Sequence, residues 1–137
     1  MNLSLINDES TEFADAVKQK IVEFNQAQWQ GLSRKNLGIK LQDAEGKLLA
    51  GISGKTFGNW LLIDYLWVDD ALRHQKIGTR LLLEAESQAK ARGCQFALLD
   101  TLDFQAKPFY ERYGYRVQWI QQAYPETDSK FFMVKAL

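Results

Sequence analysis

A short polar segment between two apolar stretches carries residue types that could bind a phosphate group. It runs over residues 68–79 and contains Arg73, His74 and Lys76, followed by Gly78 at the start of a helical pattern. The first amides of a helix have no partner within the helix, and the helix dipole attracts anions there. Glycine lets the backbone approach a pyrophosphate closely. The segment therefore predicts a diphosphate site; the alternative is an ordinary strand–loop–helix junction with solvated basic residues.

One carboxylate interrupts an otherwise apolar stretch. Asp64 lies within residues 60–68, whose two alternating faces are both mainly apolar, as expected of a central strand covered on both sides. Burying a carboxylate is costly unless it lines a cavity or meets a partner. Strand alternation predicts that Asp64 shares a face with Val68. Asp64 is therefore a candidate general base, and the alternative is a structural carboxylate bonded to neighbouring backbone.

Two further reactive side chains are weaker candidates for catalysis. His74 is the single histidine and lies in the phosphate segment, where we expect it to be solvated or to contact phosphate. Cys94 is the single cysteine and has no neighbouring base in the sequence, which favours a buried, inert thiol. No group of residues has metal-ligand spacing, so no metal site is predicted.

The elements that must position these groups follow from apolar periodicity and turn signals. Ser10 or Thr11 can cap the first helix, and in the second helix Leu81 and Leu82 recur on one face while Glu86 is expected to face outward. This order predicts a mixed α/β fold in one domain spanning residues 1–137. The predicted helices cover residues 11–28, 78–92 and 105–113, and the predicted strands cover residues 37–42, 48–54, 60–68, 95–100, 115–121 and 130–135.

The phosphate segment and its flanks resemble the coenzyme-A-binding segment of the GNAT superfamily of acetyl-CoA-dependent N-acetyltransferases. The GNAT pattern there is Gln/Arg-x-x-Gly-x-Gly/Ala. Arg73 stands at its first position and Gly78 at its last, whereas Lys76 stands where the first glycine usually does. The preceding residues 66–68 and the leucines after Thr79 are similar to the family as well.

A second segment carries the same resemblance independently. Residues 103–115 are similar to the GNAT pattern Asn-x-x-Ala-x-x-Phe-Tyr-x-x-x-Gly-Phe, with four positions in register: Ala106, Phe109, Tyr110 and Gly114. The likeness extends from about residue 40 to the end of the chain. Two spaced motifs in the family's order are a stronger indication than either alone.

The resemblance implies an α/β (α+β) fold with a mixed, mostly antiparallel sheet, splayed at its centre and flanked by about four helices. It implies that the pantetheine arm of acetyl-CoA lies between strands 60–68 and 95–100, with the Val68 amide donating to the thioester oxygen. It places Tyr110 beside the sulfur as general acid; without it, Tyr110 and Phe109 would be packing residues. The residues assigned to the coenzyme are Leu66, Trp67, Val68, Arg73, His74, Gln75, Lys76, Ile77, Gly78, Thr79, Asp103, Lys107 and Tyr110.

The composition of the chain bears on which kinds of molecule it is expected to bind. The 17 basic and 17 acidic residues cancel, so no net charge directs the chain to nucleic acid or to an anionic membrane. No stretch approaches the ~20 apolar residues of a membrane span, and no targeting segment is readable, so cytoplasmic residence is expected. The expected acceptor is a small-molecule or peptide amine. Its pocket could be lined by aromatic side chains, the alternative being that they pack in the core or in a homodimer: Trp29, Trp60, Tyr65, Trp67, Trp119 and Tyr124. The alternative function is a catalytically silent module that binds acyl-CoA as a sensor.

Overall fold

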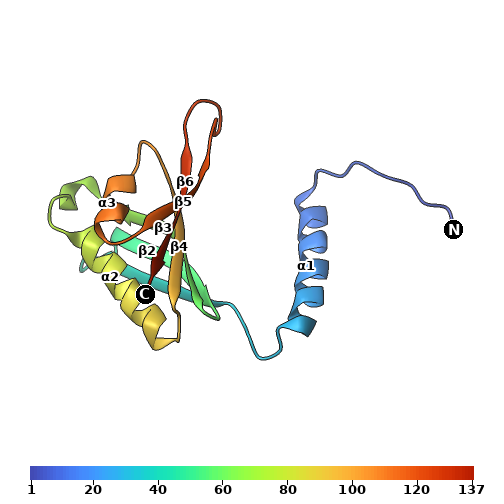
Figure 1. Ribbon diagram of the computed structural model, residues 1–137, viewed down its shortest axis with the longest axis horizontal. Helices are drawn as coiled ribbons and strands as arrows, with labels where there is room; N and C mark the ends of the chain where they lie inside the picture. The colour runs from blue at the N-terminus through green and yellow to red at the C-terminus, as the bar shows by residue number, and fades with distance from the viewer. The chain divides into compact units, whose positions relative to one another are not determined.

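The computed structural model describes all of residues 1–137, which form two compact units, Met1–Leu32 and Ser33–Leu137 (Figure 1). The first unit contains the helix α1 (Thr11–Gln28). Its N-cap is Ser10, whose hydroxyl oxygen accepts a hydrogen bond from the Phe13 amide at 3.1 Å, so the predicted start and end of this helix are both confirmed. Four large apolar side chains spaced three or four residues apart share one face of α1: Phe13, Val17, Ile21 and Phe24.

The second unit is built on a six-stranded sheet in the order β1-β2-β3-β4-β6-β5. Every neighbouring pair is antiparallel except β3 and β4, which run parallel, so the predicted mixed, mostly antiparallel fold is confirmed. The strands are β1 (Lys35–Gln42), β2 (Leu48–Phe57), β3 (Trp60–Val68), β4 (Phe96–Leu102), β5 (Arg116–Gln121) and β6 (Lys130–Ala136).

The two parallel strands stay paired over a short distance only. Trp60, Leu61 and Leu62 of β3 lie opposite Phe96, Ala97 and Leu98 of β4, and no pair follows. The ring of Trp60 stacks on that of Phe96, with centroids 5.0 Å apart, at the closed end. Beyond Leu98 the strands diverge, and β4 continues with β6 as its one neighbour. The predicted separation at the centre of the sheet is therefore confirmed.

A β-bulge at Asp64 alters the two faces of β3. Ser53 of β2 lies opposite Tyr65 and Gly54 lies opposite Ile63, so Asp64 is an extra residue without a partner in the register. A Cβ on Gly54 would collide with the carbonyl oxygen of Leu62, so only glycine allows the strands to approach this closely.

The bulge changes which β3 side chains enter the core. Leu61 and Ile63 are buried in it before the bulge, and after it Leu66 and Val68 pack against it. Tyr65 and Trp67 are exposed by 78% and 49%. The prediction of a strand covered on both faces is therefore wrong within this unit, because one face packs on the core and the other, with Tyr65 and Trp67, stays exposed.

Helix α2 (Ile77–Ala91) lies on the sheet against β1, β2 and β3 and begins and ends within a residue of its predicted bounds. Gly93 follows it at φ +94°, the left-handed conformation that ends many helices. Leu81, Leu82 and Ala85 are buried as expected. Glu86 is buried too, 5% exposed, which corrects the prediction that it faces outward.

Two partners explain the burial of Glu86. Its carboxylate accepts a hydrogen bond from the Tyr115 hydroxyl at 2.8 Å and pairs with the Lys135 ammonium at 2.7 Å. Burial, and then the Glu86 carboxylate, raise the pKa of the Tyr115 phenol far above its usual value. The three side chains thus tie α2 to the residue before β5 and to β6, with every buried polar atom satisfied.

The remaining helices are short. A 3-10 turn, η1 (Asp70–Leu72), follows β3, and α3 (Lys107–Arg112) follows β4. The predicted 105–113 helix begins two residues late because the Gln105 side chain accepts a hydrogen bond from the Leu102 amide at 2.8 Å and closes the preceding turn. With α1 and α2 the chain has three α-helices and one 3-10 turn, close to the four expected.

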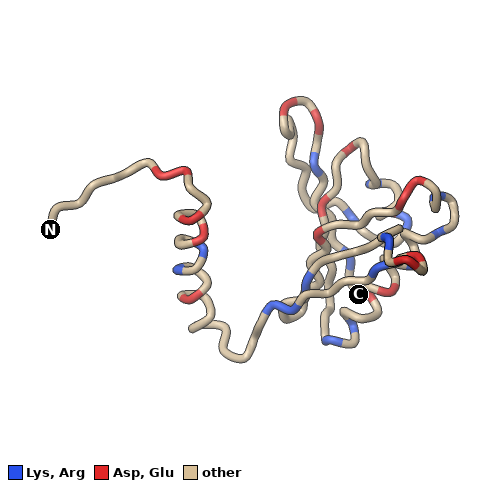
Figure 2. The backbone as a smooth tube through the Cα atoms, turned by 180° about the vertical axis from the view of Figure 1, so that it is seen from behind, with Lys and Arg blue, Asp and Glu red and all other residues tan.

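Acidic and basic residues are interspersed along the backbone (Figure 2), consistent with the equal numbers of each sign in the sequence. None of the helices combines the length and the hydropathy required to cross a membrane.

Candidate active site

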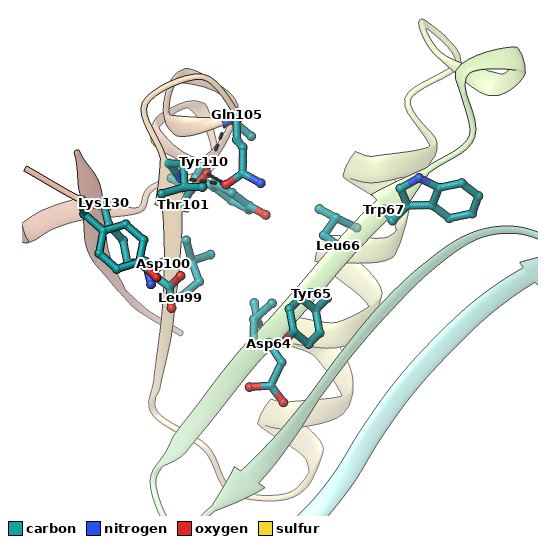
Figure 3. Close-up of a pocket in the computed structure, with 14 residues that line it drawn as sticks. Asp64, Tyr65, Leu66, Trp67, Leu99, Asp100, Thr101, Gln105, Tyr110 and Lys130 are labelled. Atoms are coloured by element: carbon teal, nitrogen blue, oxygen red, sulfur yellow. Dashed lines mark hydrogen bonds between the residues drawn. The ribbon is translucent and has the colours of Figure 1, made fainter. Parts of the chain in front are cut away.

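A cavity of about 350 Å³ opens where β3 and β4 separate (Figure 3). Its size is within the range of small-molecule sites. Residues 63–67 of β3 form one wall and residues 99–102 of β4 the other, and the rest of the lining comes from Gln105, Ala106, Tyr110, Tyr124 and Lys130. The sheet thus builds a two-walled site from strands that are paired at one end and open at the other.

Tyr110 closes this cavity from the side of α3. Its ring is held edge-on between Phe109 and Tyr115, with centroid distances of 5.2 and 5.8 Å, and its side chain is 7% exposed. Figure 3 shows its hydroxyl pointing from α3 toward Leu66 on the β3 wall. Burial, and then the Asp100 carboxylate, raise the pKa of Tyr110 to about 12. The cavity is therefore supplied with a phenol that stays protonated and can donate.

Asp64 lines the same cavity, but not in the way the sequence predicted. Its side chain is 40% exposed and its carboxylate pairs with the Lys55 ammonium of β2 at 3.1 Å. Because of the bulge, the strand alternation that would have put Asp64 and Val68 on one face does not apply. The expectation of a buried carboxylate is wrong for this reason, and the catalytic role of Asp64 stays a prediction.

The phosphate segment leaves β3 through η1 and enters α2. Two of its residues have left-handed backbone, His74 at φ +67° and Lys76 at φ +59°. Lys76 is the N-cap of α2, where the related pattern has glycine, so the lysine adopts the conformation that glycine favours at a cost of about 1 kcal/mol. Arg73 pairs with Asp70 at 2.9 Å, and both side chains are well exposed.

The start of α2 suits an anionic ligand. No side chain caps it and no acidic residue lies in its first turn, so its amides and its dipole are not neutralised by a side chain. A Cβ on Gly78 would meet Phe109 and Val68 at 3.7 and 3.8 Å, which are ordinary contacts. The fold itself therefore does not require glycine at position 78. A diphosphate close to the backbone would account for it.

The other residues predicted to bind the coenzyme lie in the cavity lining, against the core or outside the lining. Leu66 and Trp67 line the cavity, whereas Val68 and Ile77 pack against the core. The Thr79 hydroxyl is hydrogen-bonded to that of Tyr113 at 2.7 Å. Outside the cavity lining, Lys107 pairs with Glu111 at 3.3 Å, and Asp103 accepts a hydrogen bond from the Ser129 amide at 3.0 Å.

Several cavity residues were not among the predicted site residues: Asp100, Thr101, Gln105 and Lys130. Asp100 had a usable signal, because it is a carboxylate at the end of the apolar run of β4. Tyr124 is one of the aromatic residues expected to line an acceptor pocket or to pack, and it lines this cavity. Lys130 had no signal, since it reaches the cavity through the pairing of β6 with β4.

Residues 3–115 match the family model described as the acetyltransferase (GNAT) family. The chain belongs to this GNAT acetyltransferase family. It is 33% identical to the acetyltransferase Atu2258 of Agrobacterium fabrum over 115 residues, which cover 84% of each chain. It is 39% identical to the blasticidin-S acetyltransferase of Streptomyces morookaense over 93 residues, 67% of this chain and 68% of that one. The protein is therefore an acyltransferase enzyme.

Solved structures share the fold of this GNAT acetyltransferase. An acetyltransferase from Bacillus cereus superposes with a TM-score of 0.87 at 31% identity, over 98% of both chains. An aminoglycoside 6'-N-acetyltransferase, crystallised with coenzyme A, shares the fold at a TM-score of 0.65 and 16% identity, over 96% of this chain and 97% of its own.

Proposed function

We propose that the protein transfers the acetyl group of acetyl-CoA directly to a primary amine of a small molecule. The observation that carries this proposal is the buried side chain of Tyr110, which lines a cavity between two diverging strands of a GNAT fold. The cavity of about 350 Å³ favours a small acceptor over a peptide. Acetyl-CoA is the acetyl donor, with its pyrophosphate at residues 73–79 and its thioester between β3 and β4.

The chemistry needs a neutral amine, a polarised carbonyl and a proton for the leaving sulfur. The amine nitrogen forms a bond to the thioester carbon, and the carbon–sulfur bond breaks. Tyr110 gives its proton to the departing sulfur and is reprotonated from solvent. Asp64, directly or through a water molecule, accepts the proton that the amine loses. The Val68 amide donates to the carbonyl oxygen and stabilises the charge that develops on it.

The test is an acetylation assay with acetyl-CoA and a panel of primary amines, following release of free thiol and the mass of the acetylated product. We expect turnover with at least one small amine, and a rise in melting temperature with acetyl-CoA alone, because a ligand that binds only the folded state stabilises it. Binding of acetyl-CoA without turnover on any amine would favour the sensor function instead. No melting shift at millimolar acetyl-CoA would overturn the coenzyme site.

A further inference from the structure

The cavity contains two carboxylates that differ in how their charge is balanced. Asp64 is paired with the Lys55 ammonium at 3.1 Å. The Asp100 carboxylate forms no ion pair and no side-chain hydrogen bond, although it lines the cavity. The cavity's one cation, Lys130, places its ammonium 4.1 Å from the centre of the Tyr124 ring rather than on Asp100. Asp100 is therefore the carboxylate of this cavity that has no direct ion-pair partner.

The position of Asp100 on β4 fixes the side from which it can act. It follows Leu98, the last residue of β4 that pairs with β3, by two positions. Its neighbours Leu99 and Thr101 are buried, 3% exposed each, and alternation directs Asp100 to the opposite, exposed side of the strand. The buried Tyr110 acid and the exposed Asp100 carboxylate thus line one opening from different sides of the sheet.

This arrangement separates the two ends of an acceptor molecule. The nitrogen that reacts must reach the thioester between the strands, near Tyr110, and must be neutral to do so. A second cationic group on the same molecule would be left on the exposed side, where Asp100 can accept its hydrogen bonds. The exposed ring of Tyr65 lines this opening as well and offers an aromatic face to a cation.

We propose that Asp100 binds a second positive charge on the acceptor, so that the enzyme prefers amines carrying a further ammonium, amidinium or guanidinium group. The preference rests on the proposed function, since it concerns the acceptor of that same reaction. A hydrogen-bonded pair with a charged partner is typically strong enough to change affinity by about tenfold or more. Monoamines of the same length lack that contact, and acidic amines would be repelled.

The experiment compares 1,4-diaminobutane with 1-aminobutane, two amines of equal chain length, by measuring kcat and KM for each. We expect kcat/KM to favour the diamine by about tenfold or more, mainly through KM, and this ratio to fall as salt is raised. In Asp100→Asn the ratio should approach one, whereas Asp100→Glu should retain most of it. Glu45→Gln, at the exposed β1–β2 turn, is the matched control and should keep the full ratio.

Other outcomes of this experiment would overturn either the role of Asp100 or the proposed function. A wild-type ratio near one, with turnover of both amines, would overturn the role of Asp100 and leave the acetyltransferase function intact. An unchanged ratio in Asp100→Asn, or an equal fall for both amines, would also overturn it. If Asp100→Asn does not fold, the salt dependence of the wild-type ratio is the remaining test, and a salt-independent ratio would contradict the proposal. Absence of thiol release with every amine would instead refute the proposed function.

Discussion

The ammonium nitrogen of Lys55 lies 3.1 Å from a carboxylate oxygen of Asp64, across the pair of strands β2 and β3. The register puts Lys55 opposite Leu62, so the contact is diagonal and reaches the bulged residue. The two side chains are 34% and 40% exposed, so this pair contributes at most about 1 kcal/mol to folding. A pair this weak can be exchanged for a contact between Asp64 and a substrate amine.

Asp64→Asn should shift the pH profile of kcat/KM to higher pH. Without a base, the amine must already have lost its proton, so activity should recover toward the pKa of the free amine. Lys55→Gln is the matched control, because it removes the ion pair and keeps the carboxylate. Its kcat/KM should therefore keep the activity at lower pH that Asp64→Asn loses. Identical profiles for wild type and Asp64→Asn would mean that Asp64 only partners Lys55.

Tyr110→Phe should lower the acetyl-transfer rate by about 10²-fold or more and leave acetyl-CoA affinity nearly unchanged. The ring contacts with Phe109 and Tyr115 persist in the variant, and only the proton donor is lost. Single-turnover kinetics measure the rate and calorimetry the affinity. A parental rate under conditions where chemistry limits would show that the phenol only packs.

The pKa of about 12 at Tyr110 predicts two effects of alkaline pH. The acid stays protonated, so kcat should show no loss attributable to Tyr110 between about pH 8 and pH 10. The neutral phenol contributes to the stability of the fold at pH values below about 10, its pKa in the unfolded chain. This contribution is lost as pH rises through about 12. Between pH 8 and pH 11.5, the free energy of unfolding measured in urea should fall by up to about 2 kcal/mol more for the wild type than for Tyr110→Phe. If the free energies of unfolding of the two proteins changed with pH in parallel, the raised pKa of Tyr110 would be contradicted.

Gly78→Ala should weaken acetyl-CoA binding by about tenfold while leaving the fold intact or slightly more stable. The added Cβ has room in the structure, and alanine is favoured over glycine in a helix by about 0.5–1 kcal/mol. The melting temperature without ligand therefore serves as an internal control on the affinity measured by calorimetry. Unchanged affinity would mean that no ligand approaches this part of the backbone.

Lys135→Met should destabilise the fold by about 3 kcal/mol, because the buried Glu86 carboxylate then lacks its cation. Tyr115→Phe should cost less, about 1.5–3 kcal/mol, since Glu86 keeps its ion pair. Combining Lys135→Met with Glu86→Gln should recover part of the loss, measured by urea unfolding. A loss under about 0.5 kcal/mol for Lys135→Met would contradict a coupled buried pair.

Much of the fold was predictable because its signals are local. Turn residues and periodicity located all six strands and all three helices within a few residues, and Ser10 and Gly93 act as the predicted caps. The two motifs indicated the GNAT family, and they correctly pointed to a sheet that opens at its centre. Cytoplasmic residence and a homodimer stay predictions.

The sequence alone therefore determined the order of elements, the family and the presence of Tyr110 at the site. Only the tertiary structure decided which side chains face the core, the solvent or the cavity. Alternation along β3 fails at the Asp64 bulge, which depends on the close approach of Gly54 on another strand. Glu86 is buried because partners at positions 115 and 135 come to it from other elements. Asp100 joins Tyr110 in one cavity because two strands diverge, and local periodicity carries no information about such long-range pairing.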